Sequence, residues 1–442
     1  MEGLFFLDYL YNMKKSLPSY LYLILFSCVG FVYSSNVIDI VGIQWYYLSY
    51  VNLIFLAYVI FKRISNKTKN NAPLLFFKNP INLLYTLFFL FCLISLGQSI
   101  NYSVSVITIS KLLISLTSLL IFHELEIFKN TDIKLISILM SLMLLFEVGF
   151  SLRGYFEIIK STDFEFYMAS EYLKGTTGNK NITSASIAFK LPFLYILFFL
   201  IKNKYLKGLL IVIASYAYFN LILLSSRAII VSTSVCILFY ISGSLISYYR
   251  TKTNYKIYLK RIGVYLTPII LATSFAYTSL KDDTIKIQNR VSTINTTDVS
   301  ASTRLRYYEK GVDYFLSNPI LGSGIGNWKL FSIKLDSDKI ESYIVPYVAH
   351  NDYIELLTEI GLFGTIIYLL FISSSFYFLL RVFFNTTDNQ VQNLCLLLTL
   401  PFNIYFIDSN LNFPQYRPIM QVGLVIYLLL IYSFYKKTVI NK

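Results

Sequence analysis

The chain has 442 residues, of which 56% are hydrophobic, 17% aromatic and only 14% charged. A soluble domain carries roughly 25% charged residues, so this composition excludes a soluble multidomain protein, a disordered chain and a small disulfide scaffold. The formal net charge of +14 would by itself suggest a nucleic-acid partner. The positions of the basic residues decide that question.

Apolar stretches recur along the whole chain, and a membrane-spanning helix needs about 20 mostly apolar residues. The four cysteines all lie inside such stretches without a C-x-x-C pair, which indicates neither a zinc site nor a disulfide framework. We predict an all-α polytopic membrane protein with about 12 spans. These spans are 17–35, 44–61, 81–98, 104–122, 133–152, 185–201, 208–225, 228–247, 262–280, 356–380, 391–408 and 419–435.

The basic residues give the orientation of these spans. With the N-terminus inside, the inside segments hold 20 Lys and Arg against 6 acidic residues, a net of +14 that equals the net charge of the whole chain. Basic residues concentrate in cytoplasmic loops, so both termini are expected in the cytoplasm. The charge then marks a membrane topology, and we expect membrane lipids and no nucleic acid as partners. Because no small-residue cleavage site follows the first span, we interpret it as an anchor rather than a signal peptide.

Two outside connections, 153–184 and 281–355, are much longer than the rest. We therefore divide the chain into spans one to nine (1–280), an outer loop (281–355) and spans ten to twelve (356–442). The outer loop is predicted to be a helical cap. Ser302 is expected to N-cap a helix that ends at about Ser317, and a second helix should begin near Asn351 and continue into span ten.

The glycines of the segment 320–328, Ile-Leu-Gly-Ser-Gly-Ile-Gly-Asn-Trp, invite comparison with a nucleotide-binding loop. A dinucleotide fingerprint needs a preceding strand within a βαβ unit, and none is predicted. Two interpretations stay open: a turn that permits close backbone packing, or a nest of backbone amides that binds an anion.

Several segments together resemble the outer-loop signature of the O-antigen ligase/polymerase superfamily, whose members are integral membrane glycosyltransferases. Order and spacing match over the outer loop and the start of span ten, with Tyr307-Tyr308 where Trp is commoner. A Gly/Asn turn before span six and a Ser-Arg element at a helix end fit as well. The matching segments are 302–305, 318–328, 349–353, 359–364, 175–181 and 224–227.

The resemblance implies a GT-C-like fold in a bacterial inner membrane and a periplasmic active site in the loop 281–355. It implies transfer of a glycan from an undecaprenyl-diphosphate carrier to an acceptor hydroxyl, by direct attack with inversion. Three acceptors stay open. A lipid A core would make the chain an O-antigen ligase, and another carrier-linked repeat would make it a polymerase for O-antigen or another polysaccharide. A protein side chain would make it an O-oligosaccharyltransferase, and the lack of a large C-terminal domain favours the first two.

The family motif places a general base and a catalytic arginine at His350 and Arg304. An imidazole can accept the proton of an attacking hydroxyl near neutral pH, and arginine pairs well with phosphate. Candidate diphosphate ligands are Arg227, Arg306, Lys190 and Arg417. For Lys190, which lies inside span six, phosphate contact and snorkelling to the interface are equal alternatives. Further substrate contacts are expected from Asn181, Asn351 and Tyr353.

No cofactor and no metal are expected. Asp336-Ser337-Asp338 spells D-x-D, but the surrounding sequence suggests no third ligand. A transporter or lipid flippase is the main alternative of another class, because such proteins carry ionisable residues near the bilayer midplane. Here only Glu147 and Lys111 stand out in that way, and the two halves of the chain differ. A structural scaffold would need neither an arginine set nor a histidine outside.

Overall fold

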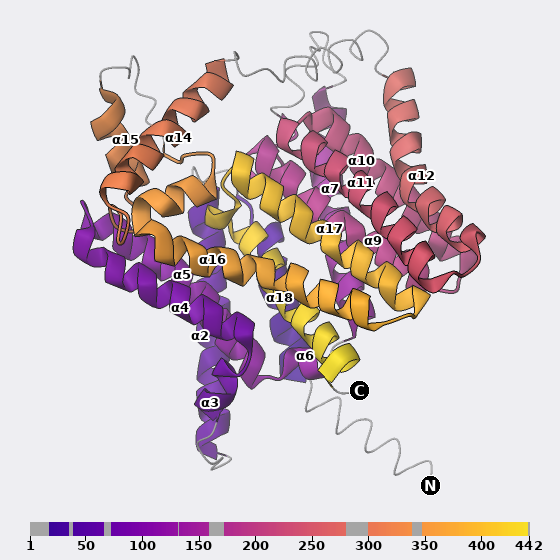
Figure 1. Cartoon of the computed structure of the whole chain (residues 1–442), viewed down its shortest axis with the longest axis horizontal. Coiled ribbons are helices and arrows are strands. Elements are labelled where there is room, and N and C mark those ends of the chain that lie inside the picture. The colour runs from indigo at the N-terminus through magenta and orange to yellow at the C-terminus, as the bar shows by residue number, and fades with distance from the viewer. Residues whose placement is uncertain are drawn as a thin grey trace.

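The computed structural model describes residues 17–34, 39–65, 72–130, 132–158, 172–279, 299–337 and 347–440. Within these ranges the chain forms helices and turns, and no strand (Figure 1). The helices are α2 (Ile40–Ser65), α3 (Ala72–Phe77), α4 (Pro80–Ser95), α5 (Tyr102–Glu124), α6 (Ile127–Asn130), α7 (Ile133–Ile158), α9 (Lys180–Leu200), α10 (Lys204–Leu224), α11 (Arg227–Thr251), α12 (Tyr255–Ser279), α14 (Val299–Ser317), α15 (Trp328–Asp336), α16 (Asp352–Asn385), α17 (Asn389–Leu411) and α18 (Pro418–Tyr435). Shorter 3-10 turns are η1 (Cys28–Phe31), η2 (Leu96–Gln98), η3 (Gly175–Thr177) and η6 (Pro414–Tyr416), and a π-helical turn, η7 (Lys436–Ile440), follows α18.

The predicted all-α membrane architecture is confirmed. Among the described residues, 11 helices are long and apolar enough to cross a membrane, and a shorter apolar helix covers Leu17–Phe31. Each of the predicted spans corresponds to one of these helices. The spans α9 and α18 are the most buried of the set, so they form the centre around which the other helices pack.

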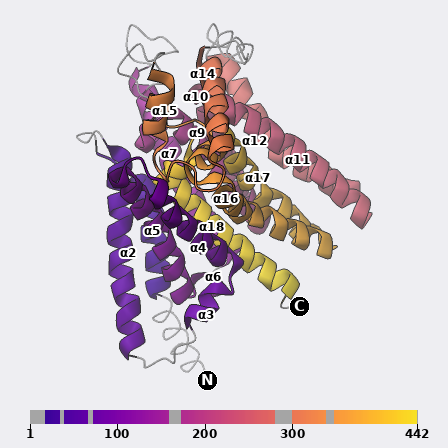
Figure 2. The same cartoon turned by 60° about the vertical axis from the view of Figure 1, so that its left-hand side comes forward.

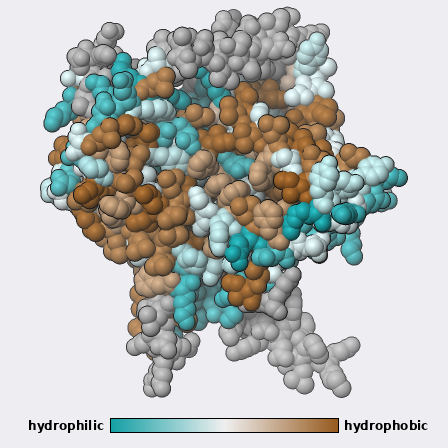
Figure 3. Space-filling model, in the orientation of Figure 1, coloured by the Kyte–Doolittle hydropathy of each residue, from teal (hydrophilic) through white to brown (hydrophobic). Residues whose placement is uncertain are grey.

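The bundle has two distinct ends. Helices α14 and α15 lie together at one end, which we call the α14–α15 end, whereas α3, α6 and the C-terminal end of α18 lie at the other (Figures 1 and 2). At this opposite end, Arg63 of α2 forms an ion pair with Glu124 of α5, and Arg250 of α11 donates to the carbonyl of Phe383 in α16. On the face shown in Figure 3, hydrophobic side chains cover much of the middle of the molecule.

Asparagine or aspartate directly precedes and caps nine of the helices in the described part of the chain. In each case the side-chain oxygen accepts a hydrogen bond from a backbone N–H of the first turn, which satisfies a donor that has no partner within the helix. The apolar runs alone would not fix where these helices start, and the caps do so. The capping residues are Asp39, Asn79, Asn101, Asp132, Asn179, Asn203, Asn254, Asn351 and Asp388.

The helical cap is confirmed in outline, with two differences from expectation. Helix α14 begins at Val299 and not at Ser302, so the predicted N-cap was wrong and Ser302 lies within the first turns. Helix α15 was not predicted as a separate element. The end of α14 at Ser317 and the start of α16 after Asn351 agree with the prediction.

Candidate functional site

The glycine-rich turn packs its backbone against a kink in α16. Ser323 N and Gly324 N donate to the carbonyls of Thr358 and Glu359, at 2.9 and 2.8 Å. The kink is at Gly361, whose φ of 70° and ψ of −168° form a combination open essentially only to glycine. A Cβ atom on Gly361 would lie 2.3 Å from the carbonyl oxygen of Ile320. The glycines therefore serve close backbone packing, the first of the two interpretations.

The amides at the end of this turn do bind an acidic group, but that group is part of the chain. Gly326 N donates to Glu359 Oε2 at 2.8 Å, and Trp328 N donates to Glu359 Oε1 at 2.6 Å. Glu359 is fully buried. Its carboxylate thus joins the turn and the first residues of α15 to α16.

His350 lies at the residue before the N-cap of α16 and has a left-handed backbone with φ of 58°. Such a conformation is uncommon outside glycine and often marks a functional position. The hydroxyl of Tyr308 in α14 donates to the His350 carbonyl at 3.0 Å. The imidazole meets the ring of Phe413 edge-on at 5.3 Å between centroids. Its Nδ1 atom is buried and has no hydrogen-bond partner among the described residues.

Arg304 lies close to this imidazole. Its guanidinium donates to the carbonyl of Leu411, the last residue of α17, at 2.8 Å. Burial, together with the charge of Arg304, lowers the pKa of His350 to about 4. The two residues that the sequence pairs as base and catalytic arginine are therefore brought together, from α14 and from the segment before α16.

The position of Arg227 follows from the register of α11 against α17. Tyr240 OH donates to Asn393 Oδ1, and Cys236 Sγ approaches the carbonyl of Leu400, so the two helices run antiparallel. Continuing that register places the exposed first residue of α11, Arg227, beside the last turn of α17. Arg227 and Arg304 thus share the end of the bundle at which α17 terminates at Leu411.

Other predicted ligands have contacts that differ from expectation. Lys190 is buried and donates to Glu147 at 2.8 Å, which is neither phosphate contact nor snorkelling. Tyr353 is only 9% exposed and packs on Phe406, so its ring is not available to stack on a sugar. Asn351 uses its side-chain oxygen to cap α16.

Two further predicted ligands, Asn181 and Arg306, lie on helices α9 and α14. Asn181 is partly buried in the first turn of α9, next to the Asn179 cap. Arg306 lies over the ring of Tyr307 at 5.8 Å. Neither position tests the expected role.

A cavity of about 360 Å³ brings Arg417 together with residues that the sequence did not single out as ligands. Lys111 of α5, Lys329 of α15 and the carboxylates Glu355 and Glu359 line it as well. Burial lowers the pKa of Arg417 to about 10, at which its guanidinium is still protonated at neutral pH. Lys111 had stood out as a charge within a span, but nothing in the sequence indicated that Lys329 would face it.

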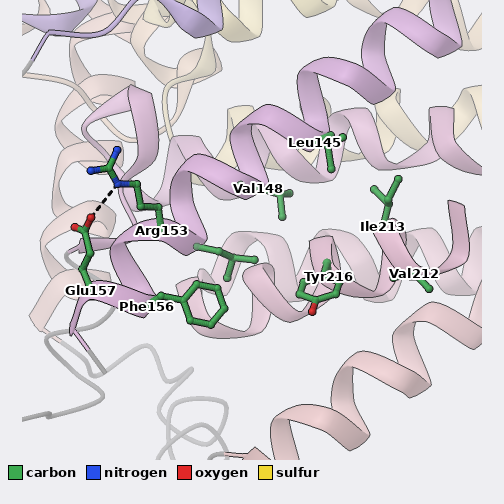
Figure 4. Close-up of a pocket in the computed structure, with 10 residues that line it drawn as sticks. Leu145, Val148, Arg153, Phe156, Glu157, Val212, Ile213 and Tyr216 are labelled. Carbon is green, nitrogen blue, oxygen red and sulfur yellow. Dashed lines mark hydrogen bonds and ion pairs between the residues drawn. The ribbon is translucent and has the colours of Figure 1, made fainter. Parts of the chain in front are cut away.

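A second cavity, of about 540 Å³, lies between α7 and α10 (Figure 4). Apolar side chains such as Leu145, Val148 and Ile213 line most of it, and the ion pair between Arg153 and Glu157 lies at one side. The polar lining of this cavity is confined to the exposed ion pair and Tyr216. The chemistry is better sought around His350.

No three His, Cys, Asp or Glu side chains lie together as a metal site within the described part of the chain. Asp338 of the D-x-D sequence lies outside the described residues. Arg304 is a cation close to His350 that can meet negative charge.

The fold and this geometry define a class: a polytopic helical membrane protein with a histidine and arginines gathered beside a helical cap at one end of its bundle. Residues 208–369 match the family model of O-antigen ligases. This match includes Arg227, Arg304 and His350, and it confirms the resemblance to the O-antigen ligase/polymerase superfamily. No curated protein matches the chain significantly.

Proposed function

We propose that the chain transfers a glycan from an undecaprenyl-diphosphate carrier to an acceptor hydroxyl at the α14–α15 end, which would face the periplasm. The observation that carries this proposal is the juxtaposition of His350 and Arg304 at the end of α17. Both residues lie within the segment that matches O-antigen ligases.

In the proposed step, His350 accepts the proton of the acceptor hydroxyl while that oxygen bonds to the anomeric carbon. The bond from this carbon to the phosphate oxygen breaks, and the electron pair leaves with the lipid diphosphate. Arg304 and Arg227 would bind the diphosphate and stabilise its growing charge, since bidentate arginine–phosphate pairs are strong and geometrically defined. Displacement from the opposite face inverts the anomeric centre.

Arg304 would also control when His350 acts. Burial lowers the pKa of His350 to about 4, and the charge of Arg304 adds to this shift because it disfavours the imidazolium. A bound diphosphate would offset the charge of Arg304 and raise that pKa towards its usual value near 6.5. The base would become effective only when the donor is in place.

The test is glycan transfer by the full-length protein in proteoliposomes that contain a carrier-linked glycan. His350→Ala should lower the transfer rate by about 10²- to 10⁴-fold, as expected for loss of a general base, and Arg304→Ala by about 10²- to 10³-fold. In cells, carrier-linked glycan should accumulate. A rate unchanged in both folded variants would reject the proposal. Addition of EDTA should have no effect.

The pattern of products in the same assay identifies the acceptor. Single additions to a lipid A core indicate an O-antigen ligase, and a ladder of repeats indicates a polymerase. Glycan on serine or threonine indicates a protein O-oligosaccharyltransferase.

A further inference from the structure

Three cationic side chains line the cavity of about 360 Å³ without an ion pair or hydrogen bond in the described part of the chain: Lys111, Lys329 and Arg417. Two of them, Lys329 and Arg417, contact aromatic rings. Lys329 Nζ lies 6.0 Å from the ring centre of Tyr347, and the Arg417 guanidinium lies 4.7 Å from that of Phe413. Three such cations around one open space form a site for negative charge.

The acidic residues nearby are bound by other groups. Glu359 accepts from the amides of Gly326 and Trp328, and Glu355 accepts from the amide of Ala349 at 2.7 Å. Asp39 precedes α2 and accepts from the amide of Gly42 at 2.8 Å. None of these carboxylates forms an ion pair with the three cations.

The depth of Lys111 indicates the kind of anion. It lies nine residues after the start of α5 at Tyr102, which at 1.5 Å per residue is about 14 Å along the helix. A lysine at that depth is costly unless it is paired or lines a cavity. Lys190 meets this requirement by pairing with Glu147, whereas Lys111 faces the cavity beside Val104 and Ile107. Apolar walls next to a cation suit an anion carried on a lipid.

The cavity adjoins the candidate base. The centre of the Phe413 ring lies 5.3 Å from that of the His350 imidazole and 4.7 Å from the Arg417 guanidinium. In a displacement with inversion, the acceptor attacks the anomeric carbon from the face opposite to the leaving diphosphate. With the diphosphate assigned to Arg304 and Arg227, the cavity is left for the acceptor.

We propose that Lys111, Lys329 and Arg417 bind a phosphate or carboxylate group of a lipid-borne acceptor, and that Phe413 separates this group from His350. The acceptor assignment rests on the proposed function, whereas the presence of an anion site does not. The acceptor would therefore be an acidic glycolipid, and its anionic group would position its hydroxyl for attack.

Binding can be measured without any knowledge of the natural acceptor. Calorimetric titration of the full chain, in a neutral detergent, with dodecyl phosphate should show binding that Lys111→Met and Arg417→Gln each weaken about tenfold or more. Lys111→Arg should retain binding, and Lys334→Ala, an exposed cation on the same helix as Lys329, should have no effect. Equal affinity in Lys111→Met, Arg417→Gln and the unsubstituted chain would overturn the proposal.

Inorganic phosphate distinguishes the source of the anion. If it binds much more weakly than dodecyl phosphate, a lipid-linked group is supported, and equal affinity would overturn the lipid-borne part of the proposal. In the transfer assay, Lys111→Met should raise KM for the acceptor and leave KM for the donor unchanged. An altered donor KM alone would overturn the acceptor assignment. If the unsubstituted chain binds dodecyl phosphate through these cations but transfers no glycan, the proposed function fails while the anion site stands.

Discussion

His350 combines a strained backbone, an unpartnered ring nitrogen and a neighbouring arginine in one residue. Each of these features follows from tertiary packing. The sequence singled out His350 as a candidate base because the His-Asn pair resembles the family motif. It could not predict the pKa, which depends on burial under Phe413 and on the approach of Arg304 from α14.

The pH dependence of transfer should reveal this environment. The pKa of His350 is about 4. When the pH falls below that value, the imidazole is protonated and cannot act as a base. The kcat/KM for the donor should therefore decrease as the pH is lowered through about 4. Because bound diphosphate raises the pKa, kcat should already fall at a higher pH. Rate profiles with varied donor concentration measure both limbs.

Arg304→Gln provides the matched test. Without the arginine charge, the pKa of His350 should move up towards 6.5, and the acid limb of the residual kcat/KM should move up with it. An unchanged limb would show that burial alone sets this pKa.

The ion pair of Lys190 and Glu147 should be structural. Both side chains are nearly inaccessible, so Lys190→Met alone leaves a buried carboxylate without its partner, a loss of about 3–5 kcal/mol for buried pairs. The double variant with Glu147→Gln should recover most of the lost thermal stability in detergent. If Lys190→Met melts normally but loses transfer, phosphate contact, one of the two roles considered for Lys190, would be supported.

At the scale of the elements, the spans were predictable because a long apolar run has few alternatives in a membrane. Boundaries were less predictable, because the asparagine caps at residues such as Asn179 and Asn203 lie in polar stretches that offer several candidates. Helix α15 was missed because its nine residues are too few for a periodic pattern. The sequence did not indicate Lys329 as a cavity residue, because the cavity forms only where residues of α5 and α15 come together in the fold.

The junction of the glycine-rich turn with α16 should be sensitive to any side chain. Gly361→Ala should destabilise the protein by at least about 1–3 kcal/mol, since its backbone conformation disfavours other residues and Ile320 leaves no space. Gly208→Ala in α10 is the control, because nothing lies within 4 Å of a Cβ atom there. That change should be neutral or stabilise by about 0.5–1 kcal/mol. Thermal melting in detergent compares them, and equal melting temperatures would contradict this account of the junction.

At the scale of the whole molecule, the predicted topology assigns the +14 net charge to the predicted inside segments, among them those that follow α2 and that join α11 to α12. The cations proposed to bind substrate are a small minority. The net charge of the whole chain therefore says nothing about the α14–α15 end, where we propose that the chemistry takes place.

The predicted orientation can be tested with a membrane-impermeant maleimide on intact cells with a permeabilised outer membrane, after removal of the native cysteines. Lys334→Cys on α15 should react, and Lys256→Cys on α12 should react only after lysis. Both residues are exposed in the structure. The reverse pattern would place the α14–α15 end in the cytoplasm.

Glu359 gives the glycine-rich turn a further property. Its carboxylate occupies the amides of Gly326 and Trp328 and is covalently attached to the same chain, so it competes as a tethered ligand. Tethering over a short distance corresponds to an effective concentration of millimolar or more. A free phosphate or nucleotide would have to displace this internal competitor as well as bind. The turn is closed to such ligands by an occupant that never dissociates from the molecule.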